Sequence, residues 1–324
     1  MAFLAIVCRM LIASLNMSRT RQVKLEHLRA FLAVSESGSI RGAARRLGVS
    51  QPGLTKILRQ LEEEFSVPLV QRSVRGATPT EYGRALVPRV KFIESEIQRA
   101  HDEVLQMRGE RKGIVAIGVS AGPAMMVPKV LARFWQRYPD VRIHVVDGMH
   151  ESTLADLRDG RLDFSVVPFD VATGNHDLKI EVLTNTTVRA VVRKNHPQRN
   201  ATSLRDLSDV DWIMSGSTKT RSNLIEKTFV KYHLRPPRLL VRCESFPTLI
   251  SLVGASDLIG ILPERVLREP FLRLILDVVA VKERFLPSRL CLVTRAGVPS
   301  TPFAQNLMRE FRRVAKQETG LNDA

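Results

Sequence analysis

The side chains best suited to molecular recognition gather in one short segment, SQPGLTKILRQ, which starts at Ser50. A Gln side chain can form two hydrogen bonds with adenine, and Lys or Arg can bind guanine or a phosphate. Amide, hydroxyl and cationic groups at helical spacing therefore predict contacts with nucleic acid, and the alternative is a polar face turned to solvent. The predicted DNA contacts in this segment are Ser50, Gln51, Pro52, Thr55, Lys56 and Arg59.

Two helices joined by a tight corner are needed to present that segment. Helices that cross steeply require a small residue where they touch, which Ala44 supplies, and a residue that tolerates positive φ at the corner, which Gly48 supplies. Leu54 provides the apolar contact where the second helix packs back, and Ser50 is placed to cap that helix. The remaining apolar positions are filled by Ala43, Leu47, Val49 and Ile57. This spacing predicts a helix-turn-helix whose second helix enters a DNA groove.

A small hairpin is expected beyond the acidic end of the second helix. In VPLVQRSVRGATPTEYG, two short extended runs flank a turn at residues 73–76. Arg72 and Arg75 lie on this wing, where cations suit phosphate or minor-groove contacts.

Residues 84–112 are predicted to form one long helix. Its apolar positions alternate at intervals of four and three, which is an a/d seam and favours pairing with a second copy of the chain. The alternative is a helix that packs on its own domain, and Pro88 is expected to kink its start. The seam consists of Leu86, Val90, Ile93, Ile97, Ala100, Val104 and Met107.

From Gly113 onward, β-rich runs alternate with helical runs. The order strand, helix, strand, helix, strand predicts a doubly wound parallel sheet. A second α/β unit covers roughly residues 186–285, and the strand RLCLVTR with the last helix is expected to return to the first unit. Two crossings between subdomains, near 185 and 286, predict a cleft between two lobes.

The ends of these strands carry the candidate ligand contacts. Hydroxyls and helix N-terminal amides favour an anion, and the aromatic rings offer an apolar wall; Ser217 or Thr218 is alternatively only a helix cap. The predicted effector contacts are Ser120, Ala121, His150, Pro168, Phe169, Ser215, Ser217, Thr218 and Phe246.

Composition and motifs restrict the classes of function. The chain has 49 Lys and Arg against 33 Asp and Glu, so its net charge of +16 favours polyanionic partners, although a merely soluble basic protein is the alternative. Its three cysteines have no paired spacing, which argues against a disulfide framework or zinc site and fits the cytoplasm. The nucleotide-binding, metalloprotease and hydrolase motifs GxGxxG, GxxxxGK[ST], HExxH and GxSxG are absent from the sequence. We therefore expect no enzyme activity, no metal and no cofactor.

The run from Leu25 to Gly83 resembles the N-terminal domain of LysR-type transcriptional regulators. The resemblance rests on Phe31, Gly38–Ser39, Ala43–Ala44, Leu47, Ser50–Gln51–Pro52, Leu61–Glu62, Leu69, Arg72, Thr78, Thr80 and Gly83. It implies major-groove contacts by Gln51, Pro52, Thr55 and Lys56 and a wing contact by Arg72. It also implies dimers or tetramers formed through the long helix, and an effector domain that resembles a periplasmic binding protein. Gly53, where the family usually has Ala, departs from the pattern.

The sequence as a whole predicts a bacterial regulator whose binding to a two-fold symmetric operator responds to an anionic effector. RNA polymerase is a further candidate partner. The rival classes are a transport-type solute-binding protein and an architectural DNA binder without sequence preference.

The expected domain division is an N-terminal extension outside the fold at 1–23, the winged helix-turn-helix at 24–83, the linker helix at 84–112, the effector domain at 113–315 and a tail at 316–324. Within the effector domain, subdomain I covers 113–185 and 286–315, and subdomain II covers 186–285. The apolar start is too short to span a bilayer, which takes about 20 residues. We expect it to be a non-native or overlong start, with Met17 or Met10 as the initiator, and the alternative is a short apolar helix.

Overall fold

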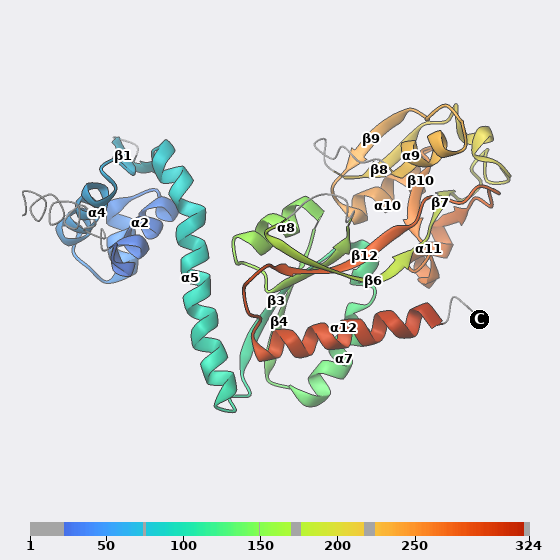
Figure 1. Ribbon diagram of the computed structural model, residues 1–324. Coiled ribbons are helices and arrows are strands. Elements are labelled where there is room, and N and C mark those ends of the chain that lie inside the picture. The colour runs from blue at the N-terminus through green and yellow to red at the C-terminus, as the bar shows by residue number, and fades with distance from the viewer. Residues whose placement is uncertain (1–22, 74–75, 149, 170–175, 217–223, 321–324) are drawn as a thin grey trace, which may run out of the picture. The chain divides into compact units, whose positions relative to one another are not determined.

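The computed structural model describes residues 23–73, 76–148, 150–169, 176–216 and 224–320 (Figure 1). The chain divides into two compact units, the first ending at Gln98 and the second beginning at Arg99. The described elements of the first unit are α2 (Leu25–Ser37), α3 (Ile40–Leu47), α4 (Gln51–Phe65), β1 (Val70–Ser73), β2 (Gly76–Pro79) and the first part of α5 (Glu81–Met107).

Three short helices form the core of the first unit. Phe31 on α2 and Leu54 on α4 are completely buried, and Val90 on α5 packs against the same apolar cluster. Gly38 ends α2 in the left-handed region, and the Ser39 hydroxyl then caps α3 by accepting a hydrogen bond from the Gly42 N–H at 3.2 Å. The end of α2 and the start of α3 are thus each set by a local residue.

Helix α5 starts earlier and ends earlier than the expected span of 84–112, and Pro88 lies inside it. Val90 is the seam residue that is completely buried, whereas Ile93 and Ile97 are 38% and 39% exposed. Val104 and Met107 are more open still, at 57% and 76%. Most of the predicted seam therefore forms an apolar stripe that this single chain leaves uncovered.

The second unit begins with a five-stranded sheet in the order β4-β3-β5-β12-β6. Its elements are β3 (Gly113–Val119), α6 (Ala121–Ala124), α7 (Val127–Arg137), β4 (Val141–Asp147), α8 (His150–Arg158), β5 (Phe164–Pro168), β6 (Leu178–Thr186), β12 (Ser288–Arg295) and α12 (Pro302–Gly320). One apolar cluster packs α7 and α12 against the sheet, with the rings of Phe164 and Phe311 edge to face at 5.8 Å. A separate cluster includes Leu154 and Leu157 of α8 together with strand residues, among them Cys291.

The expected parallel sheet is confirmed for β3, β4 and β5, but β12 runs antiparallel to both of its neighbours. The reversal follows from the chain path. Strand β6 leads out of this sheet into β7 (Val188–Arg193), and β12 returns to it after the second subdomain. A returning strand runs away from the crossing, whereas a departing strand runs toward it.

The second subdomain combines two small sheets. Its elements are β7, η1 (Leu204–Leu207), β8 (Trp212–Ser215), α9 (Leu224–Lys231), β9 (Leu239–Cys243), α10 (Phe246–Ala255), β10 (Gly260–Pro263), η2 (Val266–Arg268), α11 (Pro270–Ile275) and β11 (Leu276–Val278). Strands β8 and β9 are parallel, and a parallel bridge joins Trp212 to Ile259. Strand β7 lies between β10 and β11 and is antiparallel to both, so it departs from a uniformly parallel arrangement.

Arg99 fastens the last turns of α5 within the second unit. Its Nε donates to Asp163 Oδ1 at 2.9 Å, and a terminal nitrogen donates to the carbonyl oxygens of Gly160 and Leu162 at 2.8 and 2.7 Å. The other Asp163 oxygen accepts the Ala116 N–H of β3 at 2.8 Å. Both side chains of the ion pair are only 13% exposed. The pair therefore joins the helix to the middle of β3 and to the residues that directly precede β5.

Among the described residues, no helix has the length and apolar character that a membrane crossing requires. The two described cysteines, Cys243 and Cys291, are buried, and burial raises the pKa of the Cys291 thiol.

Replacing Arg99 by Leu should destabilise the second unit by about 3 kcal/mol, because it leaves the Asp163 carboxylate buried without its cation. Both tryptophans, Trp135 and Trp212, lie in this unit, so their fluorescence during urea unfolding reports its stability. Adding Asp163→Asn should recover much of the loss, because the amide oxygen can still accept the Ala116 N–H without carrying a charge.

Arg108→Leu is the matched control, since Arg108 is exposed just beyond the same helix. Equal unfolding midpoints for Arg99→Leu and Arg108→Leu would contradict the assigned role of the ion pair.

Candidate DNA-binding surface and effector site

The corner between α3 and α4 has the predicted geometry. Gly48 adopts φ 68°, in the left-handed region, and its N–H bonds to carbonyls at the end of α3. Ala44 and Leu54 are buried where the helices meet. Leu47 and Val49, which the sequence pattern assigned to the apolar interior, are instead 38% and 41% exposed, because they flank the corner and not the helix contact.

Helix α4 presents a capped N-terminus and an exposed polar face. The Ser50 hydroxyl accepts the Gly53 N–H at 3.1 Å, which confirms the expected N-cap, and Pro52 lies in the first turn. Gly53 leaves room for this cap, since a Cβ there would lie 3.0 Å from Ser50 Oγ. The structure places Gln51, Pro52, Lys56 and Arg59 on the exposed surface and Thr55 at its half-buried margin.

Two cations on α3 were missed by sequence reasoning, which concentrated on α4. Arg41 and Arg45 are exposed and lie four residues apart, so they share a face of the helix. The first helix of such a motif crosses the DNA backbone, where cations bind phosphate. A basic pair at this spacing was the signal available in the sequence.

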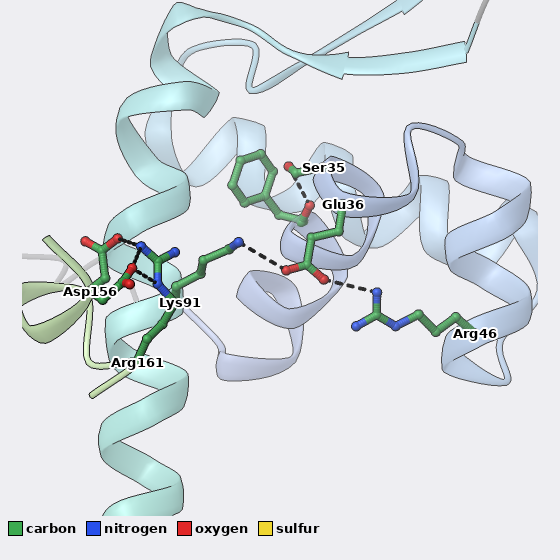
Figure 2. A network of polar contacts seen from close by, with 8 residues as sticks. Ser35, Glu36, Arg46, Lys91, Asp156 and Arg161 are labelled. Atoms are coloured by element: carbon green, nitrogen blue, oxygen red, sulfur yellow. Dashed lines mark hydrogen bonds and ion pairs between the residues drawn. The ribbon is translucent and has the colours of Figure 1, made fainter. Parts of the chain in front are cut away.

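A third arginine of α3 has a structural partner. Figure 2 shows the Glu36 carboxylate between Arg46 of α3 and Lys91 of α5, at 3.0 and 3.3 Å. Arg29 of α2 forms a second pair with Glu94 of α5 at 2.9 Å. These pairs hold α2 to α3 and to the N-terminal part of the linker helix.

The predicted wing is an antiparallel hairpin with Val70 opposite Pro79. Glu62 at the end of α4 fastens it, since one carboxylate oxygen accepts the N–H groups of Leu69 and Val70 at 2.8 and 3.0 Å. Arg72 is exposed on β1, and Arg75 lies outside the described residues. The wing is thus tied directly to the helix that is predicted to enter the groove.

In the first subdomain, two predicted effector contacts, Ser120 and Pro168, lie at the C-terminal ends of the neighbouring parallel strands β3 and β5. Ser120 follows β3, and its N–H bonds to the Val166 carbonyl of β5, the strand that ends at Pro168. The buried Ser120 hydroxyl oxygen has no hydrogen-bond partner among the described residues. Ala121 begins α6, whereas Phe169 is only 3% exposed and packs in the apolar cluster beneath α8. His150 begins α8.

In the second subdomain, Ser215 ends β8 opposite Cys243 of β9, and Phe246 begins α10 three residues later. Ser245 caps α10 by accepting the Thr248 N–H. Ser217 and Thr218 lie outside the described residues. The two subdomains approach each other at Gly122, where an added Cβ would lie 3.5 Å from Pro263 Cγ.

Comparison with known proteins decides the family. A family model described as "Bacterial regulatory helix-turn-helix protein, lysR family" matches residues 25–84, and one described as "LysR substrate binding domain" matches residues 108–316. The chain belongs to the LysR family.

Curated relatives of this LysR-family chain are named as regulators. It is 27% identical to HTH-type transcriptional regulator TdcA of Escherichia coli (strain K12) over 244 residues, covering 74% of this chain and 77% of that protein. It is also 27% identical to a probable nitrogen assimilation transcriptional activator of Synechococcus elongatus over 304 residues, covering 91% and 95%. The relatives and the family are transcriptional regulators and not enzymes, as the sequence predicted.

Solved structures share the fold. The LysR-family regulator CbnR matches with TM-score 0.67 at 19% identity over 90% of this chain and 99% of that one. CbnR complexed with its target DNA matches with TM-score 0.66 at 19% identity, covering 90% and 100%. The matches to the two family models show that this LysR-family chain is a DNA-binding transcription regulator with an effector-binding domain.

Gly83→Ala should loosen the wing, because a Cβ at Gly83 would lie 2.2 Å from the Leu69 carbonyl oxygen. That oxygen also accepts the Thr80 N–H, so the backbone must shift, at a cost of about 1–3 kcal/mol. Hydrogen exchange of the Ala77 and Thr80 amides should accelerate. DNA affinity should also fall, roughly tenfold for each ~1.4 kcal/mol of binding free energy that the displaced wing loses.

Gly42→Ala is the control, since its Cβ meets only ordinary contacts of 3.5 Å or more within a helix. Unchanged exchange in Gly83→Ala would mean that the close approach does not position the wing.

Proposed function

We propose that this protein is a sequence-specific regulator that reads a two-fold symmetric operator through α4 and the wing. The main support is that Gln51, Pro52, Lys56 and Arg59 are exposed on a helix whose N-terminus is capped by Ser50. Ser50 and Thr55 complete the proposed contacts on this helix, and Arg72 and Arg75 supply the wing contacts. A polar face of this kind can distinguish base edges, whereas a purely basic face binds all DNA alike.

We also propose that a small anion held between the subdomains modulates this binding. Support comes from Ser120 and Ala121, which lie at the edge where β3 and β5 end, and from Gly122, which approaches Pro263 of the second subdomain. Ser215 and Phe246 occupy the corresponding edge of β8 and β9. An effector that binds one arrangement of the subdomains more tightly shifts the population toward it.

The proposed assembly is a homodimer or homotetramer formed through α5. The apolar stripe that includes Ile97, Val104 and Met107 is exposed in the single chain, and burying it against a second copy removes apolar surface from water. A dimer also supplies two recognition helices for the two halves of a symmetric site.

Gln51→Ala should reduce sequence discrimination, since a bidentate base contact contributes about 1–3 kcal/mol. Arg72→Ala should weaken binding to all DNA and reduce the log–log salt slope by about 1. The measurement is binding to an operator selected from a random library, and to random DNA, at several fixed salt concentrations.

Gln60→Ala is the matched control for Gln51, because Gln60 is exposed on the same helix nine residues further along, roughly 13 Å from the N-terminal end that meets the bases. Equal losses on operator and random DNA for Gln51→Ala would overturn its assignment as a base contact.

Ile97→Glu should dissociate the assembly, because it places a charge within the proposed seam. Sedimentation should show a monomer at concentrations where the wild type associates, and operator affinity should fall with it. Ser95→Glu adds the same charge on the side of α5 away from the seam and should leave the assembly intact. An associated Ile97→Glu protein would place the dimer contact elsewhere.

A further inference from the structure

The turn end of the wing rests on the corner between α2 and α3. The Ala77 N–H, near the start of β2, donates to the Gly38 carbonyl oxygen at 2.8 Å. Gly38 is the residue that ends α2, and the next residue, Ser39, caps α3. A hydrogen bond between backbone groups therefore joins the hairpin to the point where the chain passes from one helix to the next.

This contact requires glycine at the end of the turn. Gly76 adopts φ 130°, a backbone conformation that residues with a Cβ rarely adopt. A Cβ on Gly76 would lie 2.4 Å from the Gly38 carbonyl oxygen, well inside van der Waals contact. The obstacle is a backbone atom at a helix end and not the tip of a flexible side chain, so the hairpin itself would have to move.

The other end of the wing is fastened separately. One oxygen of the Glu62 carboxylate accepts the Leu69 N–H at 2.8 Å, and the Thr80 hydroxyl donates to the Pro68 carbonyl oxygen at 2.7 Å. Between the two ends, Ala77 is only 2% exposed and belongs to the apolar cluster of the three helices. The wing is therefore held to the helices along its whole length in the protein alone.

The contact with the corner connects two elements whose cations suit DNA phosphates. Arg72 lies directly opposite Ala77 across the hairpin, and Arg41 is in the first turn of α3, three residues after Gly38. Both arginines are exposed. The hydrogen bond between Ala77 and Gly38 thus fixes the backbone that carries the wing cation relative to the backbone that carries the α3 cation.

We propose that Gly76 is a positioning residue for DNA binding, which seats the wing on the α2–α3 corner and so holds Arg72 in place for a phosphate. The inference deepens the proposed function and rests on the wing contact of Arg72 given there. A side chain whose backbone is already in place loses less conformational entropy on binding than one on a mobile arm. The alternative is a hairpin that reaches its position only on DNA.

Hydrogen exchange of the full-length wild-type protein tests whether the wing is seated in advance. The Ala77 amide should be protected in the free protein, and a saturating DNA duplex should add little protection, because the bond to Gly38 already exists. The amide of Leu58, buried within α4, is the reference for a protected site. An Ala77 amide that exchanges freely until DNA is added would overturn the proposal, and this result does not depend on the folding of any variant.

Gly76→Ala tests the consequence for DNA binding. The variant should weaken binding to random DNA and to a selected operator alike, about tenfold, and reduce the log–log salt slope by about 1, because Arg72 leaves its phosphate. In an Arg72→Ala/Arg75→Ala background, the same substitution should change the affinity by less than about twofold, since the cations that it displaces are already gone. A merely structural role would weaken binding equally in both backgrounds.

Gly109→Ala is the matched control. Gly109 also has a positive φ, of 90°, but a Cβ there would meet nothing within 4 Å, so this variant adds backbone strain without a contact. It should leave the DNA affinity and the salt slope unchanged. Far-ultraviolet circular dichroism should show wild-type helix content in both glycine variants.

The outcomes distinguish this inference from the proposed function. If Arg72→Ala/Arg75→Ala leaves binding to every DNA unchanged, the proposed wing contact fails and the positioning role fails with it. A loss in that double variant without a loss in Gly76→Ala contradicts the positioning role alone. Equal losses from Gly76→Ala in the two backgrounds also contradict it, because the effect would not pass through the wing cations.

Discussion

The guanidinium of Arg99 fastens the last turns of the linker helix to the rest of the second unit. One side chain binds a carboxylate and two backbone carbonyls, and the same carboxylate binds the backbone of β3. The anchor contacts β3 at Ala116, near the middle of the strand, and directly precedes β5, and these strands end at Val119 and Pro168. Because strands are stiff along their length, displacement at the proposed effector contacts can be transmitted to the last turns of α5. An almost buried ion pair, with both carboxylate oxygens of Asp163 engaged, is the contact through which the proposed effector site would act on the linker helix.

The DNA-binding unit depends on short-range constraints instead. Gly48 allows the corner, Ser50 caps α4, and Glu62 ties the wing to the end of that helix. The residues in these contacts are at most eight positions apart in the sequence. For that reason the helix-turn-helix could be predicted from residue types and spacing, as could the hairpin and the capped start of α4. Leu47 and Val49 were misassigned because apolar character does not distinguish a helix interface from an adjacent corner.

Contacts distant in sequence were beyond such reasoning. Arg99 and Asp163 are separated by 64 residues, and nothing in the local pattern pairs them. The reversed direction of β12 and the burial of Phe169 likewise follow from how the chain returns between subdomains. The order of strands along the chain predicted a two-lobed α/β domain. The direction of each strand, however, depends on whether the chain is leaving its subdomain or returning to it. The candidate effector residues could be located at strand ends from the sequence. How deeply each side chain is buried could be seen only in the packed structure.

Charge and specificity have separate origins in this molecule. A net charge of +16 attracts any polyanion, and that attraction is independent of sequence and weakened by salt. Arg41 and Arg45, like the wing arginine Arg72, add to this general term. Discrimination among DNA sequences must then come from groups that contact base edges, and the proposed group is Gln51, which is exposed in the first turn of α4.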